Sequence, residues 1–150
     1  MTELGIVAVG KLRDGYAKNA VSDYAKRLSR YCAFQIAEVR DFPDDQNSTA
    51  REAALILPKI KGICVPLCVE GEQLTSEALA EFLRRHAVEG GSRVTFVIGG
   101  SLGLDEKIKS AGRLRLSLSK MTFPHQLARV LLTEQLYRAF KIISGENYHK

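Results

Sequence analysis

Strand-like and helix-like segments alternate along the whole chain, and this alternation constrains the fold more than any other feature. Short apolar runs, rich in β-branched residues, are each followed by a longer segment with helical spacing. The expected strands are 4–9, 34–40, 63–69, 93–98 and 114–118, the expected helices are 16–30, 49–61, 76–88, 105–110 and 124–144, and a turn is expected at 70–75. This pattern predicts an α/β fold, a mostly parallel sheet of five or six strands with helices on both faces.

Local signals place some of the helix ends. The motif Thr49-x-x-Glu52 matches a capping box and predicts the start of the second helix. Thr122 is a candidate cap for the last helix, with Pro124 in its first turn, and Gly145 is expected to end that helix.

The chain length and the positions of the cysteines limit which class of protein this can be. A chain of 150 residues is expected to fold as one domain, 1–150, without disulfide staples. Cys64 and Cys68 lie on one expected strand, about 13 Å apart, which is too far for a disulfide. We expect buried thiols and a cytoplasmic protein, because no signal peptide or membrane span is evident.

Metal binding is not expected. His86, His125 and His149 are far apart in sequence, no pair has the spacing of metal ligands, and no carboxylate flanks them. No nucleophile motif appears either, so covalent hydrolysis has no support.

The net charge of +5 is unevenly distributed. Residues 107–150 hold nine basic and two acidic residues, whereas residues 38–89 hold ten acidic and six basic ones. A polyanion partner at the C-terminal end would explain this split, and so would an ordinary solvated surface.

The expected ligand site is at the carboxyl ends of the strands, where open α/β sheets bind their ligands. Those ends are 67–71, 99–103 and 118–122. The glycine-rich turn at 99–103 lets the backbone approach a ligand closely, yet it matches neither G-x-G-x-x-G nor a Walker loop. A nucleotide-binding turn and a plain tight turn both remain open.

The last helix carries more apolar surface than one face needs. Its apolar residues cover more than half of the circumference, whereas a surface helix needs a stripe of about 100 degrees. A second copy of the chain packed about a two-fold axis would cover the surplus, and so would burial of the helix within its own domain.

Three strings of residues resemble one known family. They are Val97-Ile-Gly-Gly-Ser-Leu-Gly103, the segment from Leu116 to Phe140 that contains Ser-Lys-Met-Thr-Phe-Pro-His-Gln-Leu-Ala-Arg, and the ending Gly145-Glu-Asn-Tyr-His-Lys150. Together with Val7 to Lys11 they resemble the bacterial 23S rRNA pseudouridine N3-methyltransferase family, of the SPOUT class. The likeness spans the chain, and its C-terminal motifs are long and specific.

The resemblance implies a C-terminal trefoil knot, S-adenosyl-L-methionine as cofactor and methyl donor, and a homodimer that methylates N3 of a pseudouridine in 23S rRNA within the ribosome. It also implies a set of residues lining the cofactor pocket: Leu67, Gly99, Leu118, Ser119, Lys120, Met121, Thr122 and Phe123. The chain departs from the family pattern at two places. Around Cys68 the family usually has an aspartate followed by a Gly-Lys pair, which this chain lacks, and at Asn147 the family commonly has a proline. The second departure predicts a more flexible tail.

Arg138, Tyr148 and His149 are the candidate catalytic residues. We expect Arg138 to bind a base carbonyl or a phosphate, Tyr148 to stack on or hydrogen-bond the target base, and His149 to orient the base or accept its proton. Arg129 is a further candidate. The alternative role for both arginines is an ion pair at the surface or dimer interface, with Glu134 four residues from Arg138.

Two other functions remain open. One is a noncatalytic RNA-binding dimer of the same fold. The other is a dinucleotide-dependent enzyme, which the lack of an acidic ribose partner after a first βα turn disfavours.

Overall fold

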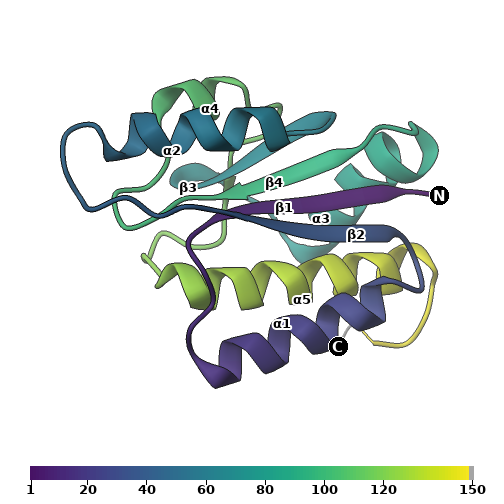
Figure 1. Cartoon of the computed structure of the whole chain (residues 1–150). Coiled ribbons are helices and arrows are strands. Elements are labelled where there is room, and N and C mark those ends of the chain that lie inside the picture. The colour runs from purple at the N-terminus through teal and green to yellow at the C-terminus, as the bar shows by residue number, and fades with distance from the viewer. Residues whose placement is uncertain (149–150) are drawn as a thin grey trace.

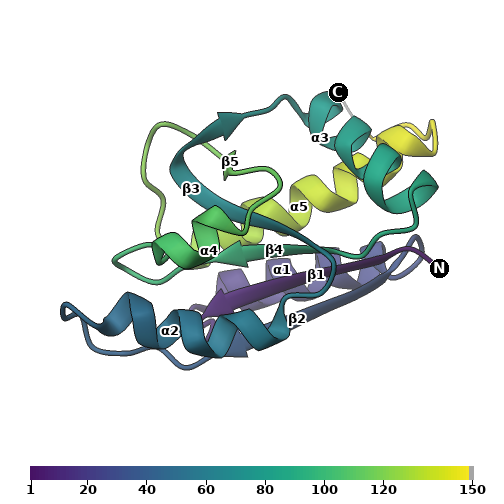
Figure 2. The ribbon, with the colours of Figure 1, turned by 90° about the horizontal axis from the view of Figure 1, so that it is seen from above.

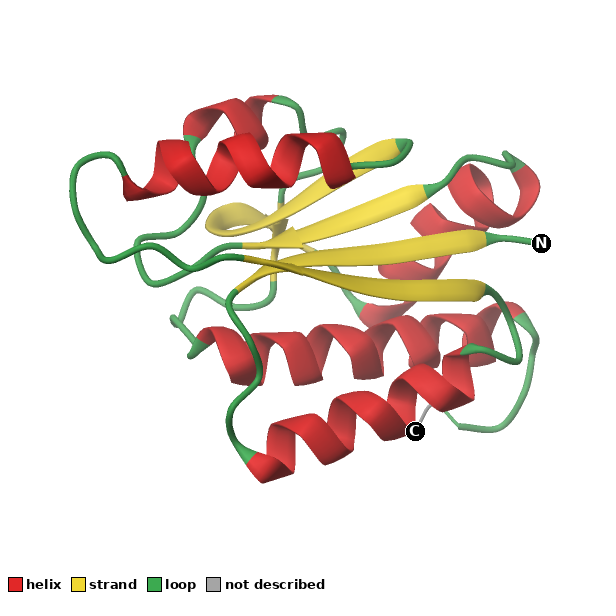
Figure 3. Ribbon diagram, in the orientation of Figure 1, coloured by secondary structure: helices red, strands yellow, loops and turns green. Residues whose placement is uncertain are grey.

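A five-stranded parallel sheet forms the centre of the protein, as the computed structural model of residues 1–148 shows (Figures 1 and 3). The strands are β1 (Glu3–Val9), β2 (Ala33–Val39), β3 (Ile63–Gln73), β4 (Val94–Ile98) and β5 (Leu116–Ser117). The helices are α1 (Gly15–Leu28), α2 (Ser48–Ile56), α3 (Ser76–Leu83), α4 (Glu106–Ser110) and α5 (His125–Ile143), with a 3-10 turn at Leu57–Lys59 and a π-helical turn at Arg84–Glu89. The predicted α/β class and helix–strand alternation are confirmed.

The helices cover both faces of the sheet. The strand order is β2-β1-β4-β3-β5, and every strand pair is parallel. Helices α2 and α4 lie on one face, and α1, α3 and α5 lie on the other (Figure 1). Parallel strands need crossovers of this kind, and two covered faces explain why all five residues of β4, Val-Thr-Phe-Val-Ile, are buried.

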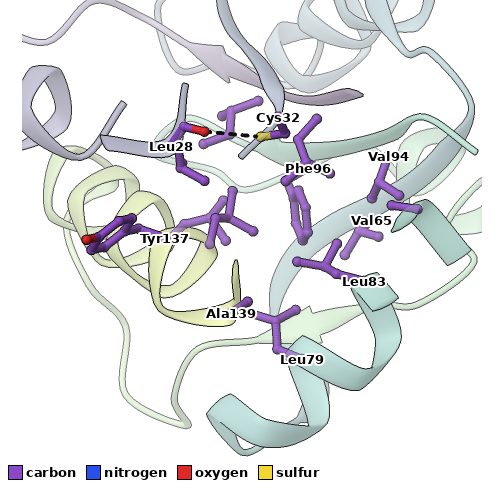
Figure 4. Packing of buried hydrophobic residues seen from close by; sticks show 14 of the residues in the cluster. Leu28, Cys32, Val65, Leu79, Leu83, Val94, Phe96, Tyr137 and Ala139 are labelled. Carbon is purple, nitrogen blue, oxygen red and sulfur yellow. Dashed lines mark hydrogen bonds between the residues drawn. The ribbon is translucent and has the colours of Figure 1, made fainter. Parts of the chain in front are cut away.

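Each face has its own apolar core. The larger core, between the sheet and α1, α3 and α5, includes Leu28, Phe96, Leu83 and Leu136, all fully buried (Figure 4). The smaller core joins the other face to α2 and α4 through residues such as Ile56 and Ile108. Within residues 1–148 no helix is both long and apolar enough to cross a membrane.

Helix α5 returns from the far edge of the sheet. β5 pairs with β3 at that edge, and the chain then passes through 118–124 into α5, which packs against α1, α3 and β4 (Figure 2). The last helix is therefore in contact with the first one, although about a hundred residues separate them. This return of the chain is consistent with the trefoil knot that the family resemblance implies.

Some predicted boundaries were wrong. β3 continues to Gln73, through the expected turn at 70–75, because the backbone N–H of Glu72 donates to the carbonyl of Arg115 across an irregular β3–β5 ladder. The expected capping box does not form: Thr49 lies inside α2, and the Glu52 carboxylate accepts from the N–H of Phe42 instead.

Of the two predicted ends of α5, one was wrong and one is confirmed. Thr122 does not cap α5, because the helix begins at His125 and Pro124 occupies the cap position. Gly145 does end α5, as predicted: it adopts φ +71°, and the N–H of Glu146 reaches back to the carbonyl of Lys141.

Arg129 is a charged residue of α5 in the interior, with only 1% of its surface exposed. Its guanidinium pairs with the carboxylate of Glu38, at the end of β2, and donates to the carbonyl of Gly10 at 3.0 Å. Its Nε is buried without a hydrogen-bond partner among the described residues. The predicted alternative for Arg129, an ion pair, is therefore what forms, although it is buried and not at the surface.

Replacing Arg129 with methionine should destabilise the fold by about 3 kcal/mol, because the Glu38 carboxylate and the Gly10 carbonyl lose their buried cationic partner. Urea unfolding at fixed protein concentration measures this loss. Arg85→Met is the control, since the Arg85 side chain is 70% exposed and its removal should cost less than about 0.5 kcal/mol. Equal unfolding midpoints for the two variants would contradict the anchoring role.

Candidate functional site

A cavity of about 680 Å³ opens at the carboxyl ends of β3, β4 and β5. Three segments far apart in sequence line it: 67–70 from β3, 98–104 after β4, and 116–125 around the β5–α5 loop, with Lys109 and Ala128 added from α4 and α5. Its volume is typical of small-molecule sites, which measure about 300–1,000 Å³. The expected position of the ligand site therefore coincides with this cavity.

The structure brings together most of the expected cofactor-binding residues. Those on the cavity wall are Leu67, Gly99, Leu118, Ser119, Met121, Thr122 and Phe123. Lys120 is exposed and does not contribute to the wall. Lys120, the one long charged side chain of the loop, thus lies outside the group that the structure brings together, and its cofactor role stays a prediction.

The turn after β4 leaves no room for a side chain at Gly99. A Cβ atom added to Gly99 would lie 2.7 Å from the carbonyl carbon and oxygen of Gly103. Gly103 has φ +78°, and its N–H donates to the carbonyl of Gly100 at 3.0 Å. Close backbone packing of this kind explains the glycines and presents main-chain groups to the cavity.

The β5–α5 loop is held by its own serines. The Ser117 hydroxyl donates to the carbonyl of Ser119 at 2.9 Å, and the Ser119 hydroxyl accepts from the N–H of Met121 at 3.0 Å. Met121 is 75% exposed, so its side chain stands at the rim of the cavity. Leu102 and Val69, also on the wall, are exposed as well and make the rim apolar.

The cavity wall also holds residues that the sequence analysis did not select. Lys109 of α4 donates from its Nζ to Oε1 of Glu70 at 2.6 Å. Cys68 lies beside this pair, and burial, with the nearby charge of Glu70, raises the pKa of its thiol. The thiol is therefore protonated at neutral pH, and an anionic group at this position, such as the family's usual aspartate would supply, is absent.

Arg138 and Tyr148 contact each other but do not line the cavity. The guanidinium of Arg138 bonds to Glu134. The guanidinium carbon, Cζ, lies 4.8 Å from the centre of the Tyr148 ring. Tyr148 donates its hydroxyl to the same Glu134 carboxylate at 2.9 Å and packs edge-on against Tyr137. Arg138 is ten residues beyond Ala128 on α5, which places it about 15 Å from the cavity wall.

The tail is docked along α5 as far as Tyr148. Glu146 accepts from the Tyr31 hydroxyl at 2.9 Å and from the Lys141 ammonium at 2.7 Å. These bonds and the ring contact of Tyr148 hold 145–148 in place, and the greater flexibility predicted from Asn147 stays a prediction. His149, the third expected catalytic residue, lies outside the described residues.

Tyr148 is a hydrogen-bond donor in this setting. Burial raises the pKa of its phenol, and the bond to Glu134 raises it further. Burial lowers the pKa of the Arg138 guanidinium, but the hydrogen bond and the charge of Glu134 raise it by more, so the pKa of Arg138 is raised overall. Both side chains therefore keep their protons at neutral pH and can stabilise negative charge.

The amino end of α5 also holds the loop after β1. The Gln126 side-chain oxygen accepts from the N–H groups of Arg13 and Asp14, at 2.8 and 3.0 Å. Gln126 adjoins His125, which lines the cavity. Among residues 1–148 no group of histidine, cysteine, aspartate and glutamate is arranged to hold a metal ion.

Comparison with known proteins agrees with this geometry. The sequence profile of a family described as "Predicted SPOUT methyltransferase" matches residues 2–149. Proteins named "Ribosomal RNA large subunit methyltransferase H" from Acetivibrio thermocellus and Ruminiclostridium cellulolyticum are each 48% identical, covering 97% and 99% of this chain and 98% and 99% of theirs. A solved structure titled a probable methylase family protein from Haemophilus influenzae superposes with a TM-score of 0.63 at 15% identity, covering 100% of this chain and 72% of that one.

The profile covers nearly all of the chain, and the relatives match it over nearly their whole length. The superposition with the solved structure shows a shared fold. The chain belongs to the SPOUT methyltransferase family.

Proposed function

We propose that this protein transfers a methyl group from S-adenosyl-L-methionine to N3 of a pseudouridine in 23S rRNA of the large ribosomal subunit, in the cytoplasm. The observation that carries the proposal is the cavity, whose wall contains seven of the eight residues expected to bind that cofactor. The name of the 48% identical relatives supports the large-subunit rRNA as substrate. The whole chain, 1–150, acts as one domain in this proposal.

The cavity suits the cofactor in size and chemistry. Leu67, Leu118 and Phe123 offer apolar contact to a purine, and the glycine turn lets main-chain groups approach it. When bound, the sulfonium supplies an activated methyl group for an in-line displacement. The work of the protein is then mainly to align a base nitrogen with that methyl group and to exclude water.

Arg138 and Tyr148 are the proposed groups that act on the base. Removal of the N3 proton leaves negative charge on the two flanking carbonyl oxygens, and a cation such as the Arg138 guanidinium stabilises such charge. The single hydroxyl proton of Tyr148 bonds to Glu134, so in this proposal it must move from Glu134 to the base in order to add a second donor. The raised pKa of Tyr148 makes it a donor rather than the proton acceptor. His149 keeps its proposed role in orienting the base or taking its proton.

A homodimer completes this site in our proposal. Within one chain the Arg138 backbone lies about 15 Å along α5 from Ala128, and neither Arg138 nor Tyr148 lines the cavity, so in our proposal a second copy presents them. The exposed apolar rim of Val69, Leu102 and Met121 gives such a copy a surface to cover.

An RNA-binding surface extends from the site along α1. The exposed cations in the preceding loop, on α1 and just after it are Lys11, Arg13, Lys18, Lys26, Arg27 and Arg30. Gln126 ties this loop to the amino end of α5, so the basic surface begins beside the cavity. Contacts with phosphates would make ribosome binding strongly dependent on salt.

Mass mapping of 23S rRNA tests the proposed reaction. We expect rRNA from a strain lacking this protein to miss one methyl group on one pseudouridine, and we expect the restored chain to return it. Identical rRNA masses in the two strains would exclude the reaction. Binding of ribosomes without binding of S-adenosylmethionine would favour the noncatalytic RNA-binding dimer.

Gly99→Ala should weaken S-adenosylmethionine binding by on the order of tenfold or more, because the new Cβ displaces the turn that lines the cavity. Isothermal titration calorimetry measures the affinity. Gly15→Ala is the matched control, since nothing lies within 4 Å of its added Cβ. Unchanged affinity in the Gly99 variant would show that the cofactor binds elsewhere.

Mixing two inactive variants tests the shared site. Tyr148→Ala should retain cofactor binding and lose methylation, whereas Gly99→Ala should bind the cofactor more weakly, on the order of tenfold or more, so the assay uses a cofactor concentration at which Gly99→Ala alone is inactive. After the subunits exchange at equal amounts, half of the dimers are mixed and each has one intact site, so about a quarter of the wild-type activity should return. Activity that stays at the level of the separate variants would place Tyr148 in the same chain's site.

A further inference from the structure

One ion pair lies on the wall of the cavity, between Glu70 of β3 and Lys109 of α4. Among the described residues that line the cavity, Glu70 is the only carboxylate and Lys109 the only lysine or arginine. Their side chains meet at 2.6 Å, and the Lys109 side chain is only 21% exposed. The sequence analysis assigned neither residue a role.

The backbone around Glu70 is fixed by the irregular end of β3. The register of the β3–β5 ladder shifts between Leu67 and Glu72, and the N–H of Glu72 donates to the carbonyl of Arg115 at 2.8 Å. A Cβ on Gly71 would lie 2.7 Å from the same carbonyl oxygen. Such an irregularity turns side chains in a new direction, and here it places 67–70 along the cavity.

The pair is charged yet neutral overall. The hydrogen bond with Lys109 lowers the pKa of Glu70, and the same bond raises the pKa of Lys109, so both ions persist at neutral pH. A carboxylate accepts about four hydrogen bonds, and the bond to Lys109 uses one of these positions. Since Lys109 already balances the charge of Glu70, the pair attracts a further cation weakly but still accepts bonds from neutral hydroxyl groups.

S-adenosylmethionine offers Glu70 cationic partners, the sulfonium and ammonium groups, and neutral donors, the ribose diol and the adenine amino group. We propose that Glu70, held in place by Lys109, accepts hydrogen bonds from the vicinal ribose hydroxyls and so selects a ribonucleoside cofactor. Carboxylates recognise ribose hydroxyls in other nucleotide-binding α/β folds. This inference rests on the proposed function, and it concerns the segment in which the chain departs from the family pattern.

Titration calorimetry with three ligands tests the assignment. The ligands are S-adenosylmethionine, its 2′,3′-dideoxyribose analogue, which lacks both hydroxyls, and 5′-methylthioadenosine, which keeps the diol but lacks the sulfonium and the amino acid. We expect Glu70→Ala to weaken S-adenosylmethionine and methylthioadenosine by a similar factor, about tenfold, because both lose a bond to a charged acceptor. The dideoxy analogue should bind the wild type and the variant almost equally.

Glu72→Ala is the matched control, because Glu72 is exposed on the same strand and does not line the cavity. It should leave all three affinities unchanged, and equal urea midpoints would show that both variants fold. Unchanged affinity in Glu70→Ala, or a loss confined to S-adenosylmethionine, would overturn the ribose assignment and leave the proposed function standing. Failure of the wild type to bind S-adenosylmethionine would overturn the proposed function, and this inference with it.

Discussion

The site depends on where α5 is anchored, and a buried arginine provides the anchor. Arg129 carries a positive charge into the interior, where it is tolerated because Glu38 and the Gly10 carbonyl receive it. Glu38 belongs to β2 and Gly10 directly follows β1, so the contact fixes the last helix against the earliest part of the chain. Ala128, the residue before Arg129, lines the cavity. The wall of the cavity therefore depends on an ion pair between segments about ninety residues apart.

The parallel sheet explains why the cavity forms where it does. All five strands point the same way, so the segments that follow β3, β4 and β5 emerge at one edge. Each contributes something different: apolar side chains and an ion pair from β3, a close-packed backbone turn after β4, and a serine-held loop after β5. Without the return of α5 beneath β4 this edge would be open to solvent on one side.

The sequence predicted the features that depend on local pattern and missed those that depend on distant partners. Hydrophobic periodicity placed the strands and helices, and Gly145 marked a helix end because its positive φ is a local requirement. The end of β3 was predicted as a turn, since Gly71 and its polar neighbours give no sign that Arg115 would pair with them. Lys109 was missed for the same reason: only the fold brings α4 beside Glu70. The expected cofactor residues came from family resemblance, which carries such tertiary information.

The position of Tyr148 has a consequence for how the two halves of the reaction are organised. Its hydroxyl and the Arg138 guanidinium share the Glu134 carboxylate, while Glu146 bonds to Tyr31 and Lys141. These contacts organise the proposed base-binding group without a contribution from the cavity. The cavity wall and this proposed group are each built within one chain, and they contact α5 at different places. A two-fold axis that relates two such helices could bring one part of each chain to the other, so that neither copy acts alone.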